Sequence, residues 1–480
     1  MTLLSTPRLS VLCLLWLPIT FAHAADWPQF RGPNAASTAA KGHAYPAEIG
    51  PTKNVIWKTD LPPGHSSPVV VGDRIYVTAE KEKQLVTIAI DRNSGKILWT
   101  TEAPNTTLEE IHKIGSHAQS TCAADTERVV SFFGSCGLFC YDLKGKELWK
   151  RPMGPFKNSF GAGSSPILVG DWVILSQDHD QDSFLEAIDK KNGKTVWKTD
   201  RSEFLRGYCT PVIWESGKRK YIVIAGTLRM VGYDLETGKE AWTVRGMSRT
   251  VCTTPVVGAD GRLYASTWTP GADEGSRIEV PAFETFIKGI DKNNNGKLEV
   301  DEVPKGPVHD RFSQFDANKD GSITRDEYER FRGLFQKTQN VLLAVRPGGT
   351  GDISNTHVDW RFDKQLPFCC SPLHTAGIVF VVKDGGFLSS VDARDGKLVK
   401  RDRLASGSGN YYASPVAGDG KVYLLSERGK LTVVSAEKEW DEIATADFKE
   451  DVYATPALVD GKIYLRTAGH LYSFGSGEKK

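Results

Sequence analysis

Two stretches of twelve residues, at 291–302 and 316–327, repeat one pattern of oxygen-bearing side chains. In each stretch these side chains stand at positions 1, 3, 5, 9 and 12, glycine stands at position 6, and position 7 offers its backbone carbonyl. Calcium prefers oxygen ligands at this spacing, and position 9 often acts through water. The predicted ligands are Asp291, Asn293, Asn295, Lys297 (carbonyl), Glu299 and Glu302 in the first stretch, and Asp316, Asn318, Asp320, Ser322 (carbonyl), Thr324 and Glu327 in the second.

Both stretches resemble the EF-hand loop, and their surroundings fit that resemblance. Apolar residues recur at helical spacing before, between and after them, as Phe283, Phe286 and Ile290, then Val308, Phe312 and Phe315, then Tyr328, Phe331 and Phe335. Leu298 and Ile323, both at position 8, are expected to pair as a short two-strand contact. The resemblance implies an α-helical EF-hand pair over residues 281–337 that binds two calcium ions. A permanently filled structural site is favoured over a calcium sensor.

A second repeat covers most of the remaining chain and sets the architecture that carries this segment. The phrase Asp-x-x-x-Gly-Lys-x-x-Trp occurs at 91–99, 189–197 and 234–242, one residue shorter at 142–149, and without the tryptophan at 392–399. We interpret the Asp and Gly as a tight turn and the Trp as a residue of the outermost strand that packs on the neighbouring unit.

A hydroxylated residue followed by proline and a β-strand precedes this phrase in most units. The eight copies are centred on Pro68, Cys122 (in place of proline), Pro166, Pro211, Pro255, Pro372, Pro415 and Pro456. Repeats of about 40–50 residues are typical of propellers and solenoids, so the gap after Pro255 holds one repeat and roughly 70 residues more. That excess contains the calcium-binding stretches, which we place within the fifth unit.

The last unit lacks its outermost strand, and a matching piece, Val55-Ile56-Trp57-Lys58, stands near the start of the chain. Pairing of the two would close a ring, whereas an open solenoid would leave both edges free. We therefore predict an all-β, eight-bladed β-propeller with a small α-helical EF-hand pair inserted in one blade. Its predicted parts are 25–280 with the closing strand, the inserted 281–337, and 338–475.

The repeat resembles the pyrroloquinoline-quinone (PQQ)-like repeat of quinoprotein alcohol dehydrogenases and of BamB-type assembly proteins. It does so through Ser-Pro-Val-Val, Gly-Asp-x-x-Tyr-Val and the Asp-x-x-x-Gly-Lys-x-x-Trp phrase. The opening at 26–33 resembles that of exported members. In those dehydrogenases a disulfide between adjacent cysteines packs on the quinone beside a calcium ion, so the resemblance makes Cys369-Cys370 of interest.

The cysteines and channel aromatics leave several interpretations open. Cys252 and Cys369 stand three residues before the proline of neighbouring units, while Cys209 and Cys370 stand two before it. A bridge between Cys252 and Cys369, a redox or metal role, and simple packing are all compatible with this register, and Cys136 with Cys140 can pair or stay free. The side chains expected to face the central channel or its mouth are those of His65, Tyr208, Tyr411, Tyr412 and Tyr453.

Composition and the N-terminus limit the class of protein. The net charge of +1 gives no reason to expect nucleic acid as a partner. Residues 1–24 fit a signal peptide, with Arg8, an apolar run and Ala22-His23-Ala24, and no later segment is long and apolar enough to span a bilayer. We expect a periplasmic or secreted protein.

These features support two functional hypotheses. The first is a calcium-binding propeller that acts as a binding or assembly scaffold, with a protein or small molecule at its face or funnel. The second is a PQQ-dependent periplasmic alcohol or sugar oxidoreductase. No motif of a haem attachment site, zinc protease or serine hydrolase occurs in the chain, and we name no catalytic residue.

Overall fold

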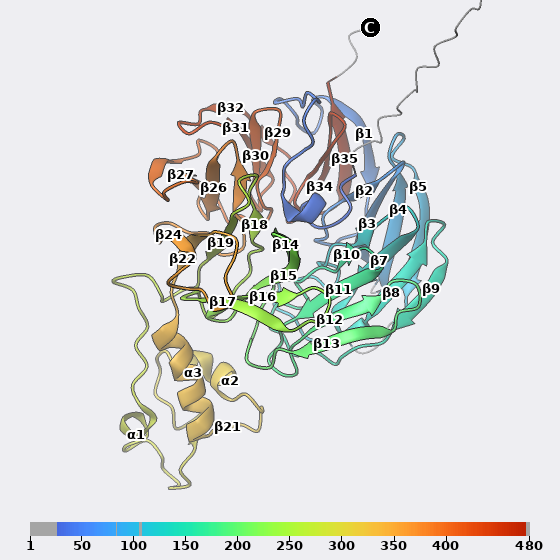
Figure 1. Ribbon diagram of the computed structural model, residues 1–480. Helices are drawn as coiled ribbons and strands as arrows, with labels where there is room; N and C mark the ends of the chain where they lie inside the picture. Colours follow the sequence, from blue (N-terminus) through green and yellow to red (C-terminus); the bar gives the residue numbers. More distant parts are fainter. Residues whose placement is uncertain (1–25, 83, 105–107, 477–480) are drawn as a thin grey trace, which may run out of the picture.

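Eight antiparallel sheets follow one another along the chain and surround a common axis, as Figure 1 shows. The computed structural model describes residues 26–476 except residues 83 and 105–107, so the predicted signal peptide lies outside the described residues. Each sheet has four strands ordered from the axis outwards, and one sheet has a fifth strand outside these four. The predicted eight-bladed propeller is confirmed.

The strands of the first four blades are these. Blade 1 contains β2 (Val69–Val71), β3 (Arg74–Lys81), β4 (Gln84–Asp91) and β5 (Ile97–Ala103); blade 2 contains β6 (Ala123–Ala124), β7 (Arg128–Phe132), β8 (Leu138–Asp142) and β9 (Glu147–Arg151); blade 3 contains β10 (Ile167–Val169), β11 (Trp172–Gln177), β12 (Phe184–Asp189) and β13 (Thr195–Asp200); blade 4 contains β14 (Val212–Ser216), β15 (Arg219–Gly226), β16 (Arg229–Asp234), β17 (Glu240–Arg245) and, outside them, β23 (Gly351–Asp352).

The other four blades follow the same plan. Blade 5 contains β18 (Val256–Val257), β19 (Leu263–Thr267), β22 (Val341–Val345) and β24 (Val358–Phe362); blade 6 contains β25 (Leu373–Thr375), β26 (Ile378–Lys383), β27 (Phe387–Asp392) and β28 (Leu398–Arg403); blade 7 contains β29 (Val416–Gly418), β30 (Lys421–Leu425), β31 (Lys430–Ser435) and β32 (Glu442–Asp447); blade 8 contains β33 (Ala457–Val459), β34 (Lys462–Arg466), β35 (His470–Gly475) and β1 (Val55–Asp60).

The ring is closed by the N-terminal strand. Strand β1 pairs antiparallel with β35, with Trp57 opposite Ser473, and so forms the outer edge of blade 8. The prediction from the orphan strand at Trp57 is therefore confirmed. Because the last blade is completed by a strand from the start of the propeller, the two ends of the blade series are held together.

A belt of eight hydrogen bonds ties the innermost strands together. In every blade the residue before the proline, or before Cys122 in blade 2, carries a hydroxyl that accepts a hydrogen bond from the backbone N–H of its counterpart in the preceding blade. The donor–acceptor distances are 3.0–3.2 Å around the complete ring. Its members are Ser67, Thr121, Ser165, Thr210, Thr254, Ser371, Ser414 and Thr455. The belt uses the serine and threonine of the repeat to fix the width of the channel.

The tryptophans of the repeat lock the outer strands together. The indole of Trp57 lies against Gly95 of blade 1, and its Nε1–H donates to the Arg92 carbonyl at 3.1 Å. Trp99, Trp149, Trp197 and Trp360 repeat this contact with the next blade. Glycine is needed at the contact for two reasons, since its φ is positive (73° at Gly95) and a Cβ there would lie 2.6 Å from the indole.

One tryptophan does not follow this pattern. Trp242 packs beneath its own blade, where its ring lies over Gly232 and edge-on to Trp214 at a centroid distance of 5.4 Å. Strand β23 pairs with β17 at Trp242 and covers that edge of blade 4. Trp214 makes the contact with blade 5 in its place, and its Nε1–H donates to the Gly261 carbonyl at 2.9 Å.

Replacing Gly95 with alanine is expected to destabilise the ring by roughly 2–4 kcal/mol, since the new methyl group combines positive-φ strain with a clash against Trp57. Gly420→Ala is the matched control, because Gly420 has a similar φ of 69° but nothing within 4 Å of a Cβ. It should cost only the strain, about 1–2 kcal/mol. Urea unfolding of both variants measures the difference, and equal losses would contradict the interlock.

The N-terminal segment crosses the face on which strands 1 and 2 of each blade turn. Asp26 accepts from Gly72 N–H in the first such turn, and Trp27 forms a bridge with Val70. The Arg31 guanidinium donates to the carbonyls of Thr254 and Pro372, between blades 5 and 6. The segment includes the short 3₁₀ turn η1 (Pro33–Ala35) and therefore closes this end of the channel (Figure 1, blue).

The excess segment lies between β19 and β22 of blade 5 and projects from the ring (Figure 1). Its elements are α1 (Phe283–Phe286), β20 (Leu298–Glu299), the 3₁₀ turn η3 (His309–Arg311), α2 (Phe312–Phe315), β21 (Ser322–Ile323) and α3 (Arg325–Lys337). A second 3₁₀ turn, η2 (Gly134–Cys136), lies in blade 2. Among the described residues, no helix has the length and hydrophobicity that crossing a bilayer requires.

Candidate metal centre and central funnel

The first predicted calcium loop is closed by hydrogen bonds from its backbone N–H groups to the carboxylates at its two ends. Asp291 accepts from the backbone N–H groups of Asn295 (3.2 Å) and Gly296 (3.0 Å). At position 12, Glu302 accepts from Lys292 N–H (2.8 Å) and Glu299 N–H (3.1 Å). The two carboxylates thus hold both ends of the loop around one centre.

The second loop reproduces these four hydrogen bonds, and Asn318 N–H adds a fifth to Glu327 at 3.2 Å. Asp316 accepts from Asp320 N–H (3.2 Å) and Gly321 N–H (3.0 Å). Glu327 accepts from Ala317 N–H (3.1 Å) and Thr324 N–H (2.9 Å). Thr324 also accepts from Glu327 N–H, so the same pair caps α3.

The two loops support each other through a short pairing and a common core. Strands β20 and β21 are antiparallel with Leu298 opposite Ile323, which confirms the expected contact. Beneath them lies a separate apolar cluster that includes Phe283, Phe315 and Tyr328. The helices differ from the expectation, because α1 ends at Phe286 and Ile290 lies outside it. Gly289, with a φ of 79°, interrupts the helix before the loop begins.

The donor set fits calcium rather than a softer metal. Each loop combines carboxylates with amide oxygens and a backbone carbonyl, and the position-6 glycines Gly296 and Gly321 have φ of 77° and 89°. Among the described residues, no three His, Cys, Asp or Glu side chains converge to hold a metal by themselves. A cation here would need the mixed oxygen set, which is the set that calcium prefers.

A funnel opens at the other end of the channel, with a free volume of about 910 Å³ including its mouth. The residue three before the proline, or before Cys122, lines it in all eight blades. This ring consists of His65, Gln119, Gly163, Tyr208, Cys252, Cys369, Tyr412 and Tyr453. The next residue points between the blades and the one after it belongs to the hydroxyl belt, as the alternation of a β-strand requires.

Aromatic rings form most of the funnel wall. His65 stacks on Tyr453 at a centroid distance of 3.9 Å, and Tyr453 lies 5.5 Å from Tyr412. On the opposite side Phe160 meets Tyr208 edge-on at 5.8 Å. Of the five residues expected at the channel, four line the funnel. The fifth, Tyr411, is buried in the core of blades 6 and 7.

Three phenylalanines of the funnel were missed from the sequence: Phe30, Phe160 and Phe368. Phe368 directly precedes Cys369, so its position one step above the ring could have been inferred from the register. Phe30 comes from the N-terminal segment and Phe160 from the linker between blades 2 and 3. Neither belongs to the repeat, so no spacing argument places them.

The funnel wall carries no Asp, Glu, Lys or Arg side chain among the lining residues that the structure describes. Burial, with a smaller contribution from Arg466, lowers the pKa of His65 to about 4, so its imidazole is neutral near pH 7. Burial also raises the pKa of Tyr412 to about 12 and holds that of Tyr208 well above its usual range. The surface offered to a ligand is therefore aromatic, hydroxylated and uncharged.

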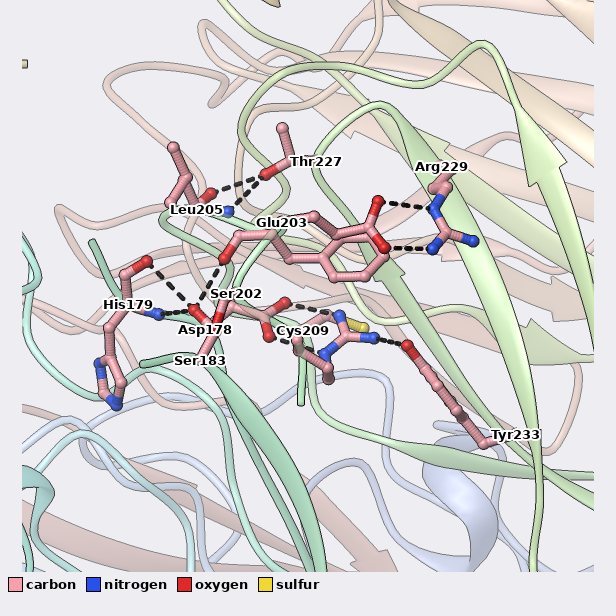
Figure 2. A network of polar contacts seen from close by, with 12 residues as sticks. Asp178, His179, Ser183, Ser202, Glu203, Leu205, Cys209, Thr227, Arg229 and Tyr233 are labelled. Carbon is pink, nitrogen blue, oxygen red and sulfur yellow. Dashed lines mark hydrogen bonds and ion pairs between the residues drawn. The ribbon is translucent and has the colours of Figure 1, made fainter. Parts of the chain in front are cut away.

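A buried ionic network, whose members Asp178 and Tyr233 are shown in Figure 2, lies next to the backbone that carries Tyr208. The Arg201 guanidinium donates to both oxygens of Asp178, at 2.8 and 2.7 Å, and to the Tyr233 hydroxyl. A β-bridge joins Asp178 to Gly207, the neighbour of Tyr208, and a second one joins Gly207 to Val251, the neighbour of Cys252. The network thus fixes the backbone of two adjacent members of the funnel ring.

Two comparisons of the sequence with known proteins address its family. The family model described as "Outer membrane protein assembly factor BamB" matches residues 35–159, 181–282 and 350–478, which is most of the chain. The chain belongs to this family. A model of the EF hand matches residues 308–331, which include the second loop of this BamB-family propeller.

Individual relatives agree with the family but are distant. The curated BamB of Alkalilimnicola ehrlichii is 32% identical over 149 residues, which cover 30% of this chain and 34% of the relative. The match thus spans about a third of that relative's length. The crystal structure of BamB from Moraxella catarrhalis has a TM-score of 0.52 at 13% identity, covering 88% of this chain and 99% of the other. The quinohemoprotein alcohol dehydrogenase of Comamonas testosteroni has a TM-score of 0.54 at 15% identity, covering 95% and 82%. These two likenesses show the fold alone.

The funnel of this BamB-family chain does not fit a quinone cofactor of the PQQ type. PQQ carries several carboxylates, and the described lining residues offer neither a cation to pair with them nor a carboxylate to hold a calcium ion beside them. The adjacent cysteines also point apart. Cys369 lines the funnel, whereas the buried Cys370 donates from Sγ to the carbonyls of Tyr411 and Ala413, each at 3.1 Å.

Acidification is expected to destabilise this BamB-family protein through the buried His179 and the half-buried His65. Burial lowers the pKa of His179 to about 3, and neither of its ring nitrogens has a hydrogen-bond partner. His65 and His179 stay neutral in the fold, whereas the unfolded chain takes up their protons below about pH 6.5. Stability is therefore complete above pH 6.5 and falls toward pH 4, by up to about 3 kcal/mol for each histidine.

Chemical unfolding of His179→Phe at several pH values measures this effect. The ring stacks on Phe156 at a centroid distance of 3.9 Å, so phenylalanine keeps that contact and removes the proton site. The slope of stability between pH 6.5 and 4 should fall by about 1.4 kcal/mol per pH unit. The exposed His43→Phe serves as the control, and an unchanged slope in His179→Phe would contradict the assignment.

Proposed function

We propose that this protein is an exported BamB-family propeller that binds two calcium ions through its EF-hand pair and acts as a binding or assembly scaffold. The observation that carries the proposal is the hydrogen bonding of the position-12 carboxylates, with Glu302 accepting from two backbone N–H groups and Glu327 from three. Calcium bound there would replace repulsion among the loop carboxylates with coordination. Its role is structural, since it would fix the two loops and the helices that flank them.

The funnel is the proposed site for a partner or ligand. Its stacked rings His65, Tyr453 and Tyr412 face Phe160 and Tyr208, and the hydroxyl belt forms the inner rim. Such a surface favours an uncharged, flat or aromatic group, for example an aromatic side chain of a protein segment. The name of the relatives, outer membrane protein assembly factor, supports a protein as the partner.

The alternative function is PQQ-dependent oxidation of an alcohol or sugar, which the fold of the dehydrogenase neighbour suggests. The uncharged funnel argues against it. For the same reason we assign no catalytic residue. Export to the periplasm or beyond is proposed from residues 1–24, and N-terminal sequencing of the mature protein tests it, with Ala25 as the expected first residue.

Calorimetric titration of the full mature chain tests the proposal. Calcium is expected to bind at two sites per chain, and PQQ is expected to produce no heat of binding with or without calcium. Absence of calcium binding would overturn the EF-hand assignment. Saturable PQQ binding accompanied by dye-linked oxidation of an alcohol would overturn the scaffold assignment.

A further inference from the structure

Two cysteines from neighbouring blades face the funnel side by side. Cys252 precedes β18 of blade 5, and Cys369 precedes β25 of blade 6, each three residues before the proline. Both line the funnel and are partly exposed, whereas Cys122, Cys136, Cys140, Cys209 and Cys370 are buried. Cys252 and Cys369 are both free thiols in this structure. The described part of the chain therefore offers the funnel two thiols, both at the seam between blades 5 and 6.

The backbone holds these two cysteines in register. Two residues after each of them, Thr254 N–H donates to the Ser371 hydroxyl at 3.0 Å, which is one link of the hydroxyl belt. The two thiols are in hydrogen-bond contact, and this contact with Cys252, followed by burial, raises the pKa of the Cys369 thiol well above its usual range. The sequence neighbour Cys370 faces the opposite side of its strand, toward carbonyls of blade 7.

We propose that Cys252 and Cys369 form a reversible disulfide across the seam of blades 5 and 6, open to small disulfides that enter the funnel. The Cys252 thiolate attacks one sulfur of the external disulfide and releases the first small thiol, which leaves a mixed disulfide on Cys252. The Cys369 thiol loses its proton, attacks the Cys252 sulfur and displaces the second small thiol. Two protein thiols are oxidised, one external disulfide is reduced to two thiols, and no other co-reactant is needed.

The bond would join blade 5, in which the EF-hand segment is inserted, to blade 6. Blade 5 carries that segment, and the chain between the two cysteines contains all of it. Long loops gain most from a cross-link, because the unfolded chain loses more freedom. Oxidation is therefore expected to raise the melting temperature of the protein by several degrees. It would also replace two thiols on the funnel wall with an apolar disulfide.

The test uses the full mature protein, first reduced and then treated with oxidised glutathione. In the native reduced protein, two thiols should react with Ellman's reagent. After treatment none should react, two glutathione thiols should be released per chain, and peptide mapping should find Cys252 joined to Cys369. Peptide mapping of the wild-type protein identifies the disulfide partner of Cys369 by itself, so the result does not depend on whether any variant folds.

Variants separate the two steps. Cys369→Ser should stop at a mixed disulfide with one glutathione on Cys252 and should lose the rise in melting temperature. Cys209 is buried in blade 4 and stands two residues before the proline, so it does not line the funnel. Cys209→Ser should therefore oxidise like the wild type. A bond between Cys369 and Cys370, or reduced protein that stays unchanged in oxidised glutathione, would overturn the proposal.

Discussion

Replacing Glu302 and Glu327 together with glutamine should weaken calcium binding at both loops by roughly 10–100-fold while the propeller stays folded. Each carboxylate stands at position 12, where it would supply two oxygens to the metal, and glutamine keeps its shape but loses its charge. Calorimetric titration with calcium measures the loss, and far-ultraviolet circular dichroism measures the fold.

A matched pair of substitutions makes this result specific. Asp301 and Asp326 are exposed acids at position 11 of the same two loops and are not predicted ligands. Changing both to asparagine removes the same charge from the same segment, so calcium affinity should fall only slightly through weaker long-range attraction. If the Asp301/Asp326 variant lost as much affinity as the Glu302/Glu327 variant, general charge rather than coordination would explain the binding.

The propeller is expected to tolerate this change because few contacts join it to the calcium loops themselves. Gln181 donates to the Ala317 carbonyl at 3.4 Å, and Arg330 donates to the Ser202 carbonyl at 3.3 Å. The firmer attachment lies at the end of α3, where Arg249 rests over the Phe335 ring at 4.4 Å and its N–H donates to Thr338. None of these contacts involves a position-12 carboxylate.

The repeat made the architecture predictable from sequence, because each unit uses the same residues for the same purpose. The hydroxyl before the proline accepts the hydrogen bond of the belt, the glycine admits the tryptophan of the preceding blade, and the orphan strand at Trp57 closes the ring. These are local features with a fixed period. Their outcome in three dimensions follows once the number of units is known.

Features that depend on one unit alone were not predictable in this way. Trp242 turns beneath its own blade because β23, a strand with no repeat signature, pairs with β17 beside it. Tyr411 occupies the position four before the proline and is therefore buried, while Tyr412, one residue later, reaches the funnel. The sequence showed that Cys252 and Cys369 both stand three residues before a proline. Only the structure showed that the residue at this position lines the funnel in all eight blades. The network of Figure 2 joins residues from two blades and has no motif.

Removal of the Asp178 carboxylate should cost about 3–5 kcal/mol of folding free energy, the largest loss expected from a single charge in this chain. Asp178 is 3% exposed and Arg201 is fully buried, and the two share a bidentate ion pair. In Asp178→Ala the Arg201 cation would remain buried without its partner. Burial acts to lower the pKa of Arg201, and it is chiefly Asp178 and Tyr233 that hold it above its usual value.

A double variant without either charge separates the effect of an unpaired buried charge from that of the packing around it. Asp178→Leu combined with Arg201→Met removes both charges, and it should be less destabilised than Asp178→Ala, because no unpaired charge is left in the core. Asp395→Ala is the exposed control, since it breaks only a surface pair with Lys397 (2.9 Å) whose attraction is screened by solvent. Urea unfolding of these three variants and the wild type gives the energies.

The same substitution should also disturb the funnel, because Asp178 pairs with Gly207 through a β-bridge and Gly207 is followed by Tyr208. A Cβ on Gly207 would lie 2.8 Å from an Asp178 oxygen, so the two residues are in close contact. In Asp178→Ala we expect Tyr208 to become more accessible to tetranitromethane, whereas the buried Tyr411 should not change. If Asp178→Ala lost no more stability than the Asp395 control, the buried ion pair would not stabilise this side of the ring. The packing of Phe204 against Arg201, at 3.9 Å from the ring centroid, would then be the main stabilising contact.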